Sequence, residues 1–281
     1  MKLQDLCQTY NIQFKKQLGQ NLLLDDNINR IMVEAAALTK DDDVVEVGAG
    51  LGALTERLVT QAGRVLAVEI DRAFLPCLED RFGSLPNMRL FRGDILNHDL
   101  ARLVPEYLPD GQSYKMVSNL PYYITTPVLF HFWESSLFFS RMVVMVQQEV
   151  AERMVAPVNS PSYCALTLAA NLYATPDIVH RVPRSCFQPR PKVNSCIVRL
   201  RTIPEGRFTE SNAFIMRVIR TAFSQRRKTL RNALTRSGAL GAPREAVLDA
   251  MEAAGIDANR RAQTVSLEEY AALAAAIRAR L

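Results

Sequence analysis

The sequence is poor in the residues that crosslink a chain or hold a metal. Its 281 residues include five cysteines and three histidines. The cysteines are scattered and never form a Cys-x-x-Cys pair: Cys7, Cys77, Cys164, Cys186 and Cys196. The histidines do not share a metal-binding spacing: His98, His131 and His180. These patterns argue against a disulfide framework and a zinc site, so we expect a cytoplasmic protein without a metal.

Long apolar runs are also missing. The stretch from Leu137 to Val146 is interrupted by Ser140 and Arg141, and a membrane span requires ~18 apolar residues. The first twenty residues have no long apolar stretch behind their charges. We therefore expect neither a signal peptide nor a membrane partner.

Most of the chain has no excess charge of either sign. Residues 203–281 contain thirteen Lys and Arg against eight Asp and Glu, a net of +5 that equals the net charge of the whole chain. Residues 1–202 are therefore neutral. The segment from Thr202 to Arg207, with Pro204 and Gly206, is typical of a boundary. We expect a domain over residues 1–202 and a basic domain over residues 203–281 that meets a polyanion.

Short β-branched runs alternate with helical patterns through the first domain. The expected helices are 25–38, 51–61, 74–82 and 163–173. The expected strands are 44–47, 65–70, 88–91, 116–118, 143–146, 178–182 and 195–200. The last two strands flank a proline-rich link, Phe187 to Lys192, and we interpret them as an antiparallel pair at the sheet edge. This order predicts a doubly wound α/β sheet, followed by a small all-α domain.

A glycine-rich turn follows the first of these strands. In Val44-Val-Glu-Val-Gly-Ala-Gly-Leu-Gly, the glycines let the backbone turn sharply and approach a ligand closely. Glu69 comes twenty-one residues after Gly48, where a carboxylate can accept hydrogen bonds from both hydroxyls of a ribose. The pattern indicates a nucleoside-containing cofactor, although a dinucleotide such as NAD and a plain tight turn also fit it. Glu46, two residues before the first glycine, favours a methyltransferase.

A second motif, Asn119-Leu-Pro-Tyr-Tyr, follows the fourth strand, where ligands bind in open α/β sheets. The N6 amine of adenine is a poor nucleophile because its lone pair is delocalised into the ring. The Asn119 side chain and a backbone carbonyl at the adjacent proline supply two uncharged acceptors for the amine hydrogens. Tyr122 offers a ring face for a base removed from its stack. A plain Asn-x-Pro-Tyr turn is the alternative.

Together these motifs resemble the ribosomal RNA small-subunit adenine N6,N6-dimethyltransferase family. The resemblance runs in order from about Phe14 to the end and rests on six motifs: Gln17-Leu-Gly-Gln-Asn, Glu46-Val-Gly-Ala-Gly, Asn119-Leu-Pro-Tyr-Tyr, Gln147-Gln-Glu-Val-Ala-Glu-Arg, Phe187-x-Pro-x-Pro-Lys-Val and Phe223-Ser-Gln-Arg-Arg-Lys-Thr. It implies a Rossmann-like class I methyltransferase domain with a seven-stranded sheet and an antiparallel edge strand. The chain departs from the family pattern at Leu22, Ala49 and Cys164, none of which has an assigned polar role.

The resemblance also implies an activity and partners. The family transfers methyl groups from S-adenosyl-L-methionine to N6 of two adjacent adenosines in the 3′-terminal hairpin of small-subunit (16S) rRNA. We expect a monomer that acts on this RNA within a pre-ribosomal 30S particle. The implied cofactor residues are Asn21, Leu23, Gly48, Glu69, Asp94 and Asn119. The implied catalytic residues are Asn119, Leu120, Pro121, Tyr122 and Phe187, with Phe187 closing over the flipped base opposite Tyr122.

Three other functions fit parts of the sequence. An antibiotic-resistance methyltransferase of large-subunit rRNA is the nearest, but Leu120 and the basic motif from Phe223 to Leu230 argue against it. A non-catalytic RNA-binding assembly factor would not need the intact Asn119-Pro121-Tyr122 set. An NAD oxidoreductase would leave that set unexplained.

A helical pattern over residues 214–236 predicts the RNA-binding surface. Arg217, Arg220, Arg227 and Arg231 would share one face of this helix, with Ser224 among them. The RNA-binding set that we expect is Arg220, Arg226, Arg227, Lys228 and Arg231. A merely solvated helix face is the alternative, and it would leave RNA docking to Lys15 and Lys16.

Overall fold

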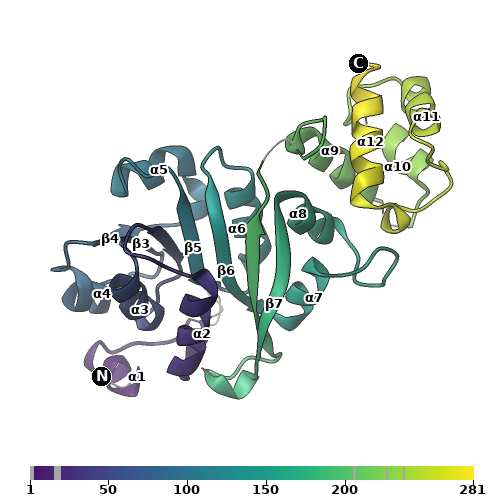
Figure 1. Ribbon diagram of the computed structural model, residues 1–281. Helices are drawn as coiled ribbons and strands as arrows, with labels where there is room; N and C mark the ends of the chain where they lie inside the picture. Colours follow the sequence, from purple (N-terminus) through teal and green to yellow (C-terminus); the bar gives the residue numbers. More distant parts are fainter. Residues whose placement is uncertain (1–2, 16–19, 205–206, 226, 237) are drawn as a thin grey trace. The chain divides into compact units, whose positions relative to one another are not determined.

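The computed structural model describes residues 3–15, 20–204, 207–225, 227–236 and 238–281, and they form two compact units (Figure 1). The first unit consists of residues 1–151 and 177–202, and the second of residues 152–176 and 203–281.

Residues 152–176 extend the second unit beyond the boundary expected from sequence. They include helix α8 (Ala165–Tyr173), which packs against α9 (Asn212–Phe223) and α12 (Leu267–Arg278). The Tyr163 hydroxyl donates to the Val265 carbonyl oxygen at 2.9 Å. Burial of the apolar face of α8 against these helices is the reason that the segment belongs with residues 203–281. The separate roles expected of the two domains stay predictions.

A seven-stranded sheet forms the centre of the first unit, as expected. Its strand order is β4-β3-β2-β5-β6-β9-β7. The strands β4, β3, β2, β5 and β6 are parallel, whereas β9 is antiparallel to β6 and lies next to the edge strand β7. The bounds are β2 Asp43–Val47, β3 Arg64–Glu69, β4 Met88–Arg92, β5 Tyr114–Asn119, β6 Phe139–Gln147, β7 Ala174–Val182 and β9 Ser195–Thr202.

Helices precede and connect these strands. They are α1 (Leu3–Thr9), α2 (Asp26–Ala36), α3 (Ala53–Gln61), α4 (Leu75–Phe82), α5 (Leu100–Tyr107), α6 (Thr125–Trp133) and α7 (Gln148–Met154), with short 3-10 turns η2 (Ile95–Asn97) and η3 (Arg184–Cys186). The Asp25 side chain caps α2 by accepting from the Asn27 N–H at 3.0 Å. All residues of β2 and nearly all of β3 are buried, which is typical of parallel strands that helices cover on both faces.

The strand order reverses between β2 and β5. From β2 the chain proceeds to β3 and β4 on one side, and from β5 it proceeds to β6 on the other. Loops that leave neighbouring strands in opposite directions open a crevice at the carboxyl edge of the sheet. The glycine turn after β2 and the Asn119 turn after β5 therefore emerge side by side.

A small second sheet was not expected from sequence. Strand β1 (Leu22–Leu23) pairs antiparallel with β8 (Phe187–Gln188), so that Leu23 lies opposite Phe187. The proline-rich link therefore holds the N-terminal segment at the carboxyl edge of the main sheet. Two-residue strands give no periodicity that a sequence pattern could reveal.

The single helix expected over residues 214–236 is wrong. Helix α9 ends at Phe223, and α10 (Leu230–Arg236) begins after a turn. The Leu230 and Arg231 N–H groups donate to the carbonyl oxygens of Arg260 and Ala258, rather than to residues four positions earlier. Helix α10 therefore begins anew against the loop at residues 258–260, and Arg217, Arg220, Arg227 and Arg231 are not one stripe on one helix. The second unit also contains α11 (Arg244–Ala253) and η4 (Ala262–Thr264).

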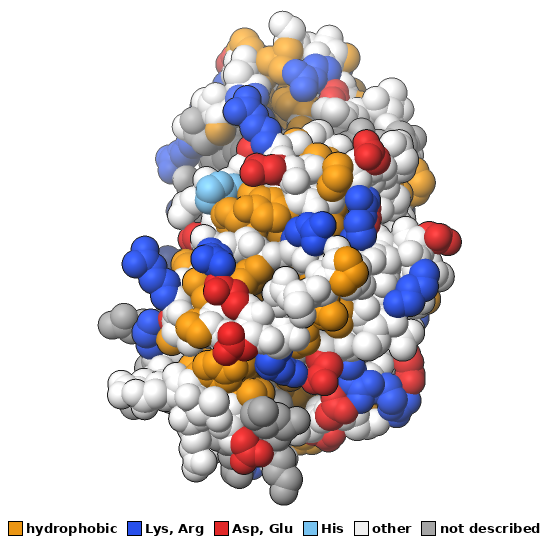
Figure 2. Space-filling view, turned by 90° about the vertical axis from the view of Figure 1, so that its left-hand side faces the viewer, with side chains coloured by type: hydrophobic (Ala, Val, Ile, Leu, Met, Phe, Trp, Pro, Cys, Tyr) orange, Lys and Arg blue, Asp and Glu red, His pale blue; other side chains and the backbone are white. Residues whose placement is uncertain are grey.

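Charges of both signs are distributed over the face shown in Figure 2, where Lys and Arg side chains lie among Asp and Glu side chains.

Among the described residues, no helix is both long and apolar enough to span a bilayer.

Candidate active site

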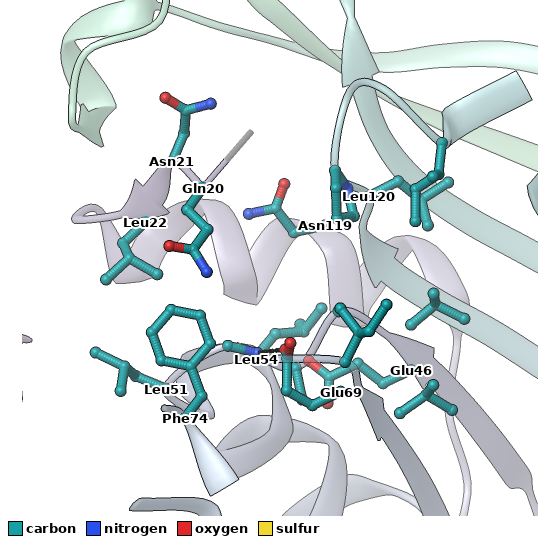
Figure 3. Close-up of a pocket in the computed structure, with 18 of the residues that line it drawn as sticks. Gln20, Asn21, Leu22, Glu46, Leu51, Leu54, Glu69, Phe74, Asn119 and Leu120 are labelled. Atoms are coloured by element: carbon teal, nitrogen blue, oxygen red, sulfur yellow. Dashed lines mark hydrogen bonds between the residues drawn. The ribbon is translucent and has the colours of Figure 1, made fainter. Parts of the chain in front are cut away.

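A cavity of about 1080 Å³, a volume that includes part of its open mouth, lies at the switch point of the sheet. It collects all the cofactor and catalytic residues expected from sequence: Asn21, Leu23, Gly48, Glu69, Asp94, Asn119, Leu120, Pro121, Tyr122 and Phe187. In Figure 3, Gln20, Asn21 and Leu22 lie along one side and Glu69, Phe74 and Leu51 along the other. Asn119 extends its amide into the space between them.

Gly48 brings the two loops of the crevice into contact. Its φ is +79°, a conformation that side chains strongly disfavour. A Cβ at this position would also lie 3.1 Å from Cδ of Pro121. A larger residue would force the two turns apart by a few tenths of an ångström, so glycine suits this position both by conformation and by space.

Glu69 ends β3 and is 5% exposed. One carboxylate oxygen accepts from the Gly50 N–H at 2.8 Å, and the other from the Asp71 N–H at 2.7 Å. Burial raises the pKa of Glu69, and these backbone donors oppose that rise. Each oxygen keeps a lone pair for a further donor, so the carboxylate can accept from a pair of hydroxyls at the cavity wall.

Glu46 is a second buried carboxyl group in the same cavity, with 1% of its surface exposed. The Thr55 hydroxyl donates to it at 2.6 Å. Burial raises the pKa of Glu46 to about 8, the Thr55 hydrogen bond opposes the rise, and the negative charge of Glu69 adds to it. None of the described residues that line the cavity is a lysine or arginine. A positively charged ligand would favour the ionised form of both carboxyl groups, so this end of the cavity is suited to one.

Asn119 is the last residue of β5, and a tight turn follows it. The Leu120 N–H donates to Met145 of β6 at 3.3 Å, which fixes where the turn begins. The Pro121 carbonyl already accepts from the Ile124 N–H and from the Thr125 hydroxyl, each at 3.2 Å. Because both lone pairs of the Pro121 carbonyl oxygen are engaged within the turn, the carbonyl of the neighbouring Leu120 is left as the candidate backbone acceptor.

Aromatic side chains form the wall beside this turn. Tyr122 is half-buried, and its hydroxyl lies 2.7 Å from Oγ of Ser195. Phe187 is buried at 3% exposure on β8. Tyr123 is 48% exposed at the same cavity. Both rings expected to enclose a base thus line one cavity, and Ser195 is a contact that the sequence motifs did not indicate.

The N-terminal segment is fastened over the cavity by Asp71, a residue that the sequence analysis missed. Its carboxylate accepts from Lys15 Nζ at 2.7 Å and from Gln20 Nε2 at 2.6 Å. Asp71 lies two residues after Glu69, and that spacing was the only available signal. Residues 17–19 of the first motif lie outside the described part of the chain.

Asp94 lines the cavity just beyond β4. It caps η2 by accepting from the Leu96 N–H at 3.0 Å, and its other oxygen accepts from Asn97 Nδ2 at 3.3 Å. The side chain is half-buried and has acceptor capacity left for a ligand amine.

The residues expected to bind RNA belong to the second unit. Arg220 is on α9, Arg227 and Lys228 are in the turn that follows, and Arg231 is on α10. All four side chains are exposed, whereas Arg226 lies outside the described residues. Arg217 donates through Nε to the Ala239 carbonyl at 2.5 Å, so it serves the fold of this unit.

The first prediction concerns the buried carboxyl of Glu46. A pKa near 8 in the folded protein, above the ordinary value of 4.5, means that folding favours the protonated form. The contribution of Glu46 to the free energy of unfolding is then fully present below pH 4.5. It declines by at most ~1.4 kcal/mol per pH unit as the pH rises to 8. Glu46→Gln should therefore become progressively more stable than the original protein between pH 5 and pH 8.

Urea unfolding of the ligand-free protein at several pH values measures this difference. Glu106→Gln, at an exposed position, is the matched control and should follow the original profile. If the free energies of unfolding of Glu46→Gln and of the unsubstituted chain change in parallel with pH, the pKa of Glu46 is not raised by folding.

Comparisons with known proteins agree with this site. The model of the family described as ribosomal RNA adenine dimethylase matches residues 11–278. The chain is 39% identical over 280 residues to the ribosomal RNA small subunit methyltransferase A of Alkaliphilus metalliredigens, covering 99% of this chain and 97% of that protein.

Solved structures show the same fold. A dimethyladenosine transferase from Plasmodium falciparum matches with a TM-score of 0.74 and 27% identity, over 90% of this chain and 95% of that one. The 23S rRNA methyltransferase ErmE matches with a TM-score of 0.65 and 25% identity, over 92% of this chain and all of that one. The chain belongs to the ribosomal RNA adenine dimethylase family.

Proposed function

We propose that this protein transfers methyl groups from S-adenosyl-L-methionine to N6 of two adjacent adenosines in the 3′-terminal hairpin of small-subunit rRNA, giving N6,N6-dimethyladenosines. The observation that carries the proposal is the placement of Asn119 at the end of β5, in one cavity with the buried carboxyl groups of Glu46 and Glu69. Family membership supplies the substrate class.

The residues that line the cavity fit S-adenosyl-L-methionine by their chemistry. Glu69 would accept from the ribose hydroxyls, and the half-buried Asp94 from the adenine amine. Gly48 would meet the methionine end, and Asn21 and Leu23 would line the cofactor site. Glu46 would favour the positively charged end of the ligand, since no lysine or arginine among the described lining residues neutralises it.

When bound, the cofactor supplies a methyl group on a positively charged sulfur. The Asn119 side-chain carbonyl and the Leu120 backbone carbonyl would accept the two N6 hydrogens of the target adenine. This arrangement turns the nitrogen lone pair toward the methyl group. These two acceptors would hold the amine while the methyl group replaces one N6 hydrogen. That proton would leave to water, and the electrons of the former bond to the methyl group would stay on sulfur. Catalysis of this kind depends mainly on positioning.

The target base would lie between aromatic rings. Tyr122 would offer one ring face, and Phe187 would close over the base from the small sheet formed by β1 and β8. A base in a duplex must leave its stack to enter such a pocket, and aromatic stacking offsets part of that cost.

The RNA would be held through its phosphates by the second unit. Arg220, Arg227, Lys228 and Arg231 are exposed there, and we keep Arg226 in this set from its sequence alone. Contacts with phosphates hold a folded hairpin by shape rather than by sequence. We propose further that the natural substrate is a pre-ribosomal 30S particle in the cytoplasm and that the protein acts as a monomer.

Large-subunit rRNA is a weaker candidate substrate. The relative at 39% identity over nearly the full chain is named for the small subunit, whereas ErmE, named for 23S rRNA, matches at 25% identity. An NAD oxidoreductase would not need the amide and carbonyl acceptors of the Asn119 turn.

Replacing Glu69 tests the cofactor site. Glu69→Ala should weaken S-adenosyl-L-methionine binding by ~1.5–3 kcal/mol, the range for hydrogen bonds to a charged group. Isothermal titration calorimetry measures this change. RNA affinity without cofactor is the control and should stay the same. Glu69→Gln keeps an acceptor for the Gly50 N–H and should lose less, while equal binding by all three proteins would contradict the assignment.

Replacing Asn119 tests the activity itself. The original protein should produce N6,N6-dimethyladenosine in undermethylated small-subunit particles, detected by mass spectrometry of the rRNA nucleosides. Asn119→Ala should slow single-turnover methylation at least ~100-fold, as expected for the loss of one transition-state hydrogen-bond partner. Its thermal unfolding and RNA affinity should remain close to the original. Methylation within a few-fold of the original would make Asn119 only a turn former.

Charge reversal tests the RNA-binding set. Arg227→Glu with Lys228→Glu should weaken RNA binding across sequences and flatten the slope of log affinity against log salt by roughly one to two units. Cofactor binding should not change. Arg244→Glu with Arg280→Glu makes the same change of charge at other exposed positions of the second unit and serves as the control. If the two double variants have equal slopes, the net charge of the unit matters and the Arg227–Lys228 surface does not.

A further inference from the structure

Ser195 is a buried polar residue that neither the motifs nor the proposed chemistry uses. It is the first residue of β9 and is 0% exposed. Its neighbours Cys196, Ile197 and Val198 are fully buried as well. A buried hydroxyl in such surroundings requires a hydrogen-bond partner, because its desolvation is otherwise uncompensated. The partner is the hydroxyl of Tyr122, 2.7 Å away.

The direction of β9 brings Ser195 to the cavity. Because β9 is antiparallel to β6, its first residue lies at the carboxyl edge of the sheet, opposite Gln147. Asn119 pairs with Met145 on the other side of β6. The Gln148 N–H also donates to the Asn194 carbonyl at 2.9 Å, which fixes the start of β9. Backbone hydrogen bonds therefore fix the position of Ser195 independently of its side-chain contact with Tyr122.

A tyrosine ring in a turn needs such an anchor if it is to present a defined face. Rotation about the bond that joins a tyrosine ring to its Cβ is broad, so packing alone leaves the plane of a half-buried ring loosely defined. A hydrogen bond at the far end of the ring fixes the direction of the ring axis. Because the hydroxyl hydrogen and the lone pairs of a phenol prefer the plane of the ring, the same bond also favours one ring plane. The Ser195 hydroxyl supplies that restraint from a separate, rigid strand.

We propose that Ser195 is a positioning residue, which holds the ring of Tyr122 in the orientation that receives the target adenine. The proposal rests on the proposed function and deepens it, because the base must stack on Tyr122 for the orientation to matter. It also assigns a limited role to the Tyr122 hydroxyl. That hydroxyl bonds to Ser195, so Tyr122 contributes its ring face to the site.

Dimethylation makes the orientation more demanding in its second step. The monomethylated amine is larger and offers one hydrogen instead of two. Fewer hydrogen bonds to the Asn119 turn are then available to align the base. Its orientation therefore depends more on stacking against Tyr122. Loss of the Ser195 anchor should therefore slow the second methylation more than the first, and monomethyladenosine should accumulate.

The experiment compares Ser195→Ala, Tyr122→Phe and the double variant in single-turnover methylation of the same RNA. Each single variant should be slowed ~3- to 10-fold, the equivalent of one neutral hydrogen bond. The double variant should be no slower than the slower single variant, because both substitutions remove one shared contact. The ratio of monomethyl to dimethyl product should rise in all three.

Stacking is measured without turnover. With 2-aminopurine at the target position and S-adenosylhomocysteine as the cofactor product, binding to the original protein should quench the fluorescence of a base stacked on Tyr122. Ser195→Ala should reduce this quenching. Ser140→Ala removes a hydroxyl near the opposite end of the sheet, where it donates to the Tyr114 carbonyl at 3.3 Å, and should leave quenching and product ratio unchanged.

Two results would overturn the proposal. One is a double variant whose loss equals the product of the two single losses, since the hydroxyls would then act separately. The other is a Ser195→Ala protein that unfolds more easily yet keeps the original rate and product ratio. If Ser195→Ala does not fold, Tyr122→Phe removes the same hydrogen bond from the exposed side. Failure of the unsubstituted protein to methylate the RNA would instead count against the proposed function.

Discussion

The close approach of Gly48 to Pro121 is the constraint on which the rest of the site depends. The two residues lie on loops that leave β2 and β5, neighbouring parallel strands at the point where the strand order reverses. With no side chain at residue 48, the glycine turn touches the Asn119 turn, and one cavity serves both. A cofactor held by the first loop and an amine held by the second can then meet. The distance between the two loops is set by the spacing of two paired strands, β2 and β5.

Burial of two carboxyl groups beside this contact shows a conflict between stability and function. Glu46 and Glu69 are 1% and 5% exposed, and burial raises the pKa of each. The backbone donors of Gly50 and Asp71 partly compensate Glu69, and Glu46 has the Thr55 hydroxyl. A protein selected for stability alone would place apolar residues there. This cost has a function if a cationic ligand binds in the site, because the ligand then supplies the positive charge that the described lining residues do not provide.

The site is enclosed by segments from distant parts of the chain. Asp71 fastens the N-terminal segment through Lys15 and Gln20, and β1 pairs with β8 to bring Phe187 to the wall. Ser195 enters from β9 and reaches Tyr122. The basic residues proposed to hold RNA belong to the second unit, with its own helical core. In the proposed function, recognition of the base and retention of the RNA would use different parts of the protein, so each could be altered separately.

The sequence by itself determined the class of fold and most of the cavity wall. Glycines after a buried strand, an acidic residue at the end of the next strand and an Asn-Leu-Pro-Tyr turn after the fourth are local patterns, and local backbone chemistry sets what they form. Their assembly into one cavity followed from the rule that parallel strands end at a common edge. Tertiary structure alone decided the pairing of β1 with β8, the Asp71 contacts, the Tyr122–Ser195 hydrogen bond and the break between α9 and α10. Each of these features depends on contacts between residues far apart in the chain. Local periodicity does not record such contacts, and the break between α9 and α10 is an example. The helical pattern of the sequence continues through residues 224–229, but α10 begins only at Leu230. The N–H groups of Leu230 and Arg231 donate to carbonyl oxygens in the loop at residues 258–260.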